Sequence, residues 1–109
     1  MAHNLELAQR MRDRLTQTAA LTEKAMFGGV AFMLNGNMAC GVHKEFMIVR
    51  VGAEKHAQAM ARPHTRPFDM TGRPMAGWVM VEPEGCASDD QLHAWMQMGL
   101  EFAGSLPAK

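Results

Sequence analysis

The sequence predicts an α+β fold, a two-layer sandwich of helices on an antiparallel sheet of about five strands in the order α-β-β-β-α-β-β-α. Apolar residues recur at helical spacing near both ends of the chain. Residues 22–51 are instead rich in Val, Ile, Phe and Met and poor in charge, which is typical of strands. Because 109 residues suffice for one hydrophobic core, we expect residues 1–109 to form a single domain.

Three segments have the features of helices. Residues 4–18 carry apolar side chains at helical spacing and predict an amphipathic helix. Residues 53–61 are good helix formers, and Pro63 prevents the helix from continuing. Ser88 with Gln91 three positions later is a capping box, which predicts the start of a third helix whose apolar stripe packs on the sheet.

The strands are separated by turn residues. Asn35-Gly36 and the polar residues 43–45 divide residues 22–51 into three strands of a meander. Residues 62–77 are rich in Pro and Gly and predict mostly loop, with a short strand at residues 68–70. Residues 78–81 return to a strand pattern that Pro83 ends, so a second hairpin is expected.

The Asn-Gly dipeptide suits a two-residue turn and so sets the pairing of the first hairpin. Phe32 should then face Ala39, and Ala31 should face Cys40. The side chains sort into two sets, with Ala31, Met33, Met38, Cys40 and Val42 on one face and Val30, Phe32, Leu34 and Ala39 on the other. Both faces are apolar, so the second must be covered by another element or by a second copy of the chain. Val30, Phe32 and Leu34 are therefore a candidate interface face.

The glycines of this hairpin do not predict a phosphate site. A phosphate loop needs a helix whose first amides point at the anion, whereas β-prone residues follow Gly28-Gly29. Met33, Met38 and Cys40 on one face could hold a soft ion such as Cu(I). However, the 12 methionines are spread through every element, so we interpret them as core residues. We predict no metal and no cofactor.

Catalytic residues are not expected either. Cys40 and His43 are close in sequence, but a Cys–His nucleophile pair needs an orienting group and an oxyanion donor that the sequence does not offer. Cys40 and Cys86 are far apart in a chain without a secretion signal, which favours reduced thiols. We therefore predict that the protein is not an enzyme.

One polar cluster is a candidate contact region. Arg62, Arg66 and Arg73 lie in the predicted loop with a single acidic residue, Asp69. The three guanidinium groups could bind a carboxylate or a phosphate, which would make the protein a small anionic-ligand-binding domain. Alternatively, Asp69 and backbone carbonyls hold these arginines in place. Trp78 beside the loop is either a partner contact or a core aromatic.

The charge and the distribution of apolar residues argue against binding to nucleic acid and to membranes. The formal net charge is zero, so we expect no direct nucleic-acid binding. Neutrality also removes a barrier to self-association, which keeps a homodimer open. The N-terminus lacks the apolar core of a signal peptide, and no run approaches a membrane span. We expect a cytoplasmic protein that does not bind membranes.

Three segments together resemble a known family: MFGGVAFMLNGNMACGV at residues 26–42, MIVRVG at residues 47–52 and GRPMAGWVMV at residues 72–81. They are similar to the N-terminal domain of the TfoX/Sxy competence regulators and stand in the family's order across residues 23–82. The resemblance implies an α+β domain with a regulatory, non-enzymatic role in activating competence genes together with the cyclic-AMP receptor protein.

Full-length relatives carry a second, helical C-terminal domain, whereas this sequence ends at Lys109 directly after the third predicted helix. The resemblance therefore implies a stand-alone N-terminal domain. The expected function is that of a regulatory or protein-interaction module with a protein partner such as a transcription factor.

Overall fold

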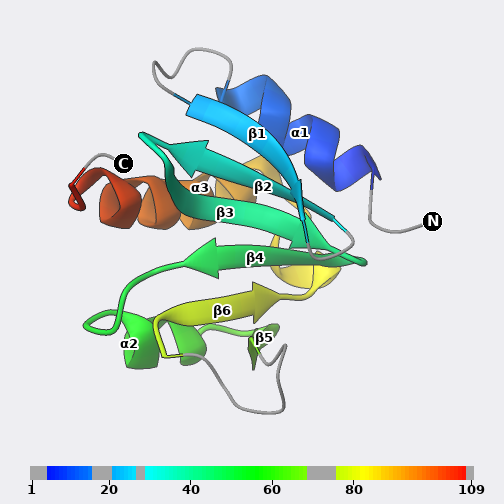
Figure 1. Cartoon of the computed structure of the whole chain (residues 1–109). Coiled ribbons are helices and arrows are strands. Elements are labelled where there is room, and N and C mark those ends of the chain that lie inside the picture. The colour runs from blue at the N-terminus through cyan, green and yellow to red at the C-terminus, as the bar shows by residue number, and fades with distance from the viewer. Residues whose placement is uncertain (1–4, 16–20, 27–28, 69–75, 108–109) are drawn as a thin grey trace.

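The computed structural model describes residues 5–15, 21–26, 29–68 and 76–107 and confirms an α+β fold with an open antiparallel sheet (Figure 1). The elements follow in the order α1 (Leu5–Leu15), β1 (Leu21–Met26), β2 (Gly29–Leu34), β3 (Asn37–His43), β4 (Phe46–Arg50), α2 (His56–Met60), β5 (Thr65–Pro67), β6 (Trp78–Val81), the 3₁₀ turn η1 (Pro83–Gly85) and α3 (Asp89–Gly104).

The six strands form one sheet in the order β1-β2-β3-β4-β6-β5, with every neighbouring pair antiparallel. The long helix α3 crosses β2, β3 and β4 and lies behind the sheet in Figure 1. The apolar residues of α1 join the same core as those of α3, and so does Ala59 of α2. All three described helices therefore pack on the same side of the sheet.

The strand count differs from the prediction because the first predicted strand is two strands. Met26 at the end of β1 lies opposite Gly29 at the start of β2, so the chain reverses direction within a segment that reads as continuously apolar. Gly29 begins a strand and sits against the next one. A Cβ atom on Gly29 would lie 1.8 Å from the carbonyl oxygen of Val42, so glycine is required there by the close approach of β3.

The predicted turn of the next hairpin is confirmed, but the predicted pairing is wrong beyond it. Asn35 and Gly36 have φ angles of 52° and 85°, as a type I′ turn requires. The register then shifts: Phe32 pairs with Cys40, so that Ala39 is the extra residue of a β-bulge. The bulge moves Cys40 to the face opposite the one that strict alternation assigns to it.

The other short elements differ in their bounds. The short strand predicted at residues 68–70 is found at Thr65–Pro67, while residues 69 and 70 lie outside the described part of the chain. Helix α2 is shorter than predicted and ends before Pro63. Helix α1 covers Leu5–Leu15, and the remaining residues of the predicted helix, 4 and 16–18, are not described.

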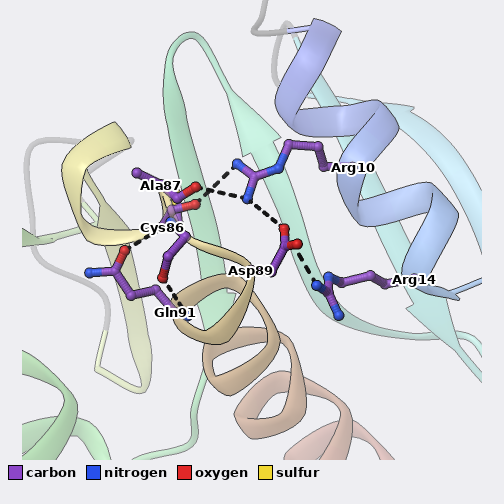
Figure 2. Close-up of polar contacts among 7 residues, drawn as sticks. Arg10, Arg14, Cys86, Ala87, Asp89 and Gln91 are labelled. Carbon is purple, nitrogen blue, oxygen red and sulfur yellow. Dashed lines mark hydrogen bonds and ion pairs between the residues drawn. The ribbon is translucent and has the colours of Figure 1, made fainter.

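The capping box of α3 is confirmed and is part of a contact between the two ends of the chain (Figure 2). The Ser88 hydroxyl accepts from the amide of Gln91 at 3.1 Å, and the Gln91 side chain accepts from the amide of Ser88 at 3.0 Å. Arg10 of α1 donates to the carbonyl oxygens of Cys86 and Ala87 at 3.2 and 3.0 Å. These bonds hold α1 against the start of α3.

Asp89, in the first turn of α3, strengthens this contact. Its carboxylate lies 3.4 Å from the Arg10 guanidinium and 3.5 Å from that of Arg14 (Figure 2). A negative charge at this position also interacts favourably with the helix dipole. Because the Asp89 side chain is 77% exposed, these ion pairs contribute little to the free energy of folding. Their main role is to fix the position of α1 relative to α3.

The main core lies between the sheet and the helices, and α3 approaches the sheet closely at the bulge. A Cβ atom on Gly99 would lie 2.3 Å from the carbonyl oxygen of Ala39. Gly99 therefore lets the helix backbone rest directly on β3. Phe32, Met47 and Leu92 are among the largest side chains buried in this layer.

Candidate interaction surface

The strands send alternate side chains to two sides, and the described helices cover one of them. The opposite side, which we call the open face, consists of Ala31, Met33, Met38, Phe46, Ile48, Phe68, Trp78 and Met80. Its centre is buried, because Ala31 and Ile48 are 0% and 2% exposed. Met33, Phe46, Trp78 and Met80 are partly exposed around that centre. The open face is therefore an apolar surface that the described helices leave uncovered.

Trp78, which the sequence singled out, lies on this face. Its ring packs against Phe68 with the ring centroids 5.9 Å apart and the planes tilted by 38°. The Arg50 guanidinium lies over Trp78 at 5.2 Å and over Phe102 of α3 at 5.1 Å. Trp78 is thus partly a core aromatic and partly a surface one, with a cation held over its ring.

The predicted arginine cluster is not brought together in the described residues. Arg62 stacks over Trp95 of α3 at 5.0 Å, on the helix side of the sheet. Arg66 pairs with Glu82 at 3.1 Å and lies 5.5 Å from the ring of Phe46, on the open face. Two of the three guanidinium groups thus lie on opposite sides of the sheet, while Arg73 and Asp69 lie outside the described residues.

The hairpin residues considered as an interface belong to the core. Val30 and Phe32 are 6% and 1% exposed, and Leu34 is a partly buried residue packed against the same cluster. This face is covered from within the chain, because α3 packs on it. The partly exposed apolar side chains are on the other side of the same strands.

The sulfur cluster and the Cys–His pair considered from the sequence are both divided between the two faces of the sheet. Cys40 lies in the helix-side core, whereas Met33 and Met38 lie on the open face. His43 is three residues beyond Cys40 on β3, so its side chain points away from that core. Neither set can converge on one ligand. Within the described residues, no group of three or more His, Cys, Asp or Glu side chains is placed to hold a metal ion.

The two thiols are in unreactive surroundings. Burial raises the pKa of Cys40 to about 12 and that of Cys86 to about 11. Both cysteines are reduced in the structure, as expected from the sequence. A thiol is a poor nucleophile while protonated, so neither side chain is activated for nucleophilic chemistry.

A hollow of about 530 Å³ lies at the C-terminal end of α3. Its wall includes Val51, Gly52 and Phe102, and Lys55 and Glu101 form an ion pair of 3.5 Å beside it. Glu54 also lines the hollow, so its wall has two carboxylates and one ammonium group. The hollow therefore has no excess of positive charge for the anionic ligand that the sequence suggested.

The comparison with protein families is informative. The TfoX N-terminal domain matches residues 13–103 of the chain. The chain belongs to this family. No curated protein and no solved structure matches it.

The TfoX N-terminal domain match begins within α1 and ends within α3, so it includes all six strands and every residue of the open face. Residues 5–12 of α1, which include Arg10, lie before it. In the described part of the chain, no helix is long and apolar enough to cross a membrane.

Sequence reasoning found part of the open face of this TfoX N-terminal domain, since it placed Ala31, Met33 and Met38 on one face and singled out Trp78. Met80 and Arg50 were not singled out, although the alternation in Phe46–Arg50 and Trp78–Val81 contains the signal. Met80 follows Trp78 by two positions, and Arg50 lies opposite Trp78 in the register between β4 and β6. What the sequence did not supply was the side on which the helices pack.

Proposed function

We propose that this TfoX N-terminal domain is a non-enzymatic regulatory module that works by binding another protein through the open face. The observation that carries the proposal is a group of partly exposed apolar side chains, Met33, Trp78 and Met80, on a sheet surface without a described helix. Contiguous apolar surface of this kind marks interaction sites more often than it occurs by chance.

The residue types support a protein partner. Methionine is unbranched and polarisable, so Met33 and Met80 can adapt to the shape of a partner. Trp78 is a large, partly exposed aromatic residue, of the type found at the centre of many interfaces. The family membership supports a regulatory role of the competence-regulator type rather than a catalytic one.

Site-specific photo-cross-linking in the cells that express the protein tests this proposal. A benzophenone amino acid replaces Met80 on the open face in one variant and exposed His93 on α3 in the control variant. We expect a discrete adduct with another protein from position 80 and none from position 93. A Trp78→Ala change in the first variant should reduce the yield of that adduct.

The opposite result is equally clear. The proposal is wrong if the open-face position gives no adduct, or if both positions give the same adducts in the same yield. A thermal unfolding curve for each variant shows that both proteins are folded before the yields are compared.

A further inference from the structure

The charged residues at the border of the open face are mostly basic. Lys24 lies opposite Ala31 in the register of β1 and β2, Arg50 lies opposite Trp78, and Arg66 lies opposite Met80. Directly opposed residues share a face of the sheet, so all three side chains border the open face. Glu82, which pairs with Arg66, is the acidic residue that we find there in the described part of the chain.

Two of these basic groups carry a positive charge that no described carboxylate neutralises. Arg66 is neutralised by Glu82 at 3.1 Å. Arg50 instead lies between the rings of Trp78 and Phe102, and no described carboxylate is within ion-pair distance of it. Lys24 is exposed on β1, again without an ion pair to a described carboxylate. Among the described residues, the border of the open face therefore carries uncompensated positive charge, on a protein whose formal net charge is zero.

We propose that the open face binds a peptide segment that is both acidic and apolar. Apolar side chains of the segment contact Met33 and Met80, and its carboxylates reach Arg50 and Lys24. This inference rests on the proposed function and adds the chemistry of the partner. Complementary charge at the rim of an apolar centre gives such an interface its orientation and specificity.

A second copy of the chain fits the open face less well than an acidic peptide does. In a two-fold dimer the same surface meets itself, so the basic border of one copy would face the basic border of the other. Like charges placed across an interface oppose association. The charge pattern thus favours a partner of opposite sign over self-association.

Nucleic acid also fits less well, although aromatic and basic residues lie together. Bases bind an open sheet by stacking on exposed aromatic rings. Here Arg50 covers Trp78 at 5.2 Å and Arg66 covers Phe46 at 5.5 Å. A base would have to displace both guanidinium groups, whereas a carboxylate can pair with Arg50 where it lies.

A peptide selection tests the inference. The probe is a yeast-displayed library of random peptides of about ten residues, since extended chain covers about 3.3 Å per residue and must cross a molecule of about 30 Å. Peptides are kept if they bind the wild-type protein and not a Met80→Gln variant, in which the new side chain is polar but uncharged. We expect the selected peptides to be enriched in Asp and Glu together with Leu, Met or Phe.

The outcomes separate the two proposals. Selected peptides that are neutral or basic would overturn this inference and leave the open face as a binding surface. Failure to find any peptide that distinguishes the wild-type protein from the Met80→Gln variant would count against the proposed function itself. A wild-type dimer in light scattering that Met80→Glu dissociates would replace the acidic partner by a second copy.

Binding of a selected acidic peptide to charge variants completes the test. Fluorescence anisotropy should show affinity reduced about ten-fold or more by Arg50→Glu, and also reduced by Lys24→Glu. Lys55→Glu makes the same change of charge away from the open face and should have little effect. Equal losses in all three variants, or tighter binding of oligo-dT than of the peptide, would overturn the inference.

Discussion

The two faces of the sheet are made by alternate residues of the same strands, yet they differ in how completely they are covered. In β4, Met47 and Val49 point to the helices and are 0% exposed, whereas Phe46 and Arg50 on the open face are partly exposed. Both faces are apolar, so composition alone does not distinguish them. Ile48 lies between Phe46 and Arg50 on the open face and is 2% exposed. The two faces therefore differ at the margin of the open face, where no described helix packs, and not at its centre.

The largest difference between the faces is expected for matched Phe→Ala changes. Phe32 is 1% exposed under α3, so Phe32→Ala should lower the free energy of unfolding by about 3–5 kcal/mol. Phe46→Ala on the open face should lower it by about 1 kcal/mol or less, since that ring is partly exposed. Urea unfolding measures both. Equal losses would mean that the two faces are equally buried in solution.

A smaller effect is expected where α3 touches the sheet. In Gly99→Ala the new methyl group would lie 2.3 Å from the carbonyl oxygen of Ala39, so helix and strand must separate. We expect a loss of about 1–3 kcal/mol in the free energy of unfolding. Gly104→Ala is the control, because its nearest atom would be the Leu34 Cδ2 at 3.6 Å. If Gly99→Ala were as stable as Gly104→Ala, the close contact at the bulge would be wrong.

At neutral pH no effect is expected from the third comparison, a dependence of stability on alkaline pH that reports the burial of Cys40. Burial raises the pKa of Cys40 from 9.0 to about 12, so the folded protein holds this proton more tightly than the unfolded chain. Its contribution to stability is complete below pH 9 and is lost as the pH rises from 9 toward 12. The slope from this one thiol is at most about 1.4 kcal/mol per pH unit.

Urea unfolding of the wild-type protein and of Cys40→Ala, at several values between about pH 8 and pH 11, isolates this slope. The variant should lose less stability per pH unit than the wild type, whatever its stability at neutral pH. Parallel curves would mean that Cys40 is in contact with water and does not lie in the core between the sheet and the helices.

The candidate site was less predictable than the fold. Trp78 was singled out and lies on the open face, but Val30 and Phe32, offered as an interface, are core residues. There is a physical reason why the residues predicted to form an interface are core residues. Strict alternation identifies two apolar sets and gives no sign of which one the helices will cover. Arg62 and Arg66 were grouped because they are close in sequence, yet such side chains can point to opposite sides of a sheet, as these two do.

The sequence by itself determined the features that local chemistry controls. Asn35-Gly36 determined a turn because both residues tolerate positive φ, and Ser88 with Gln91 determined a helix start because they satisfy free amides. Only the tertiary structure decided the bulge at Ala39, the side of the sheet that receives α3, and hence the position of Cys40. These depend on contacts between segments far apart in the chain, where a shift of one residue exchanges the two faces.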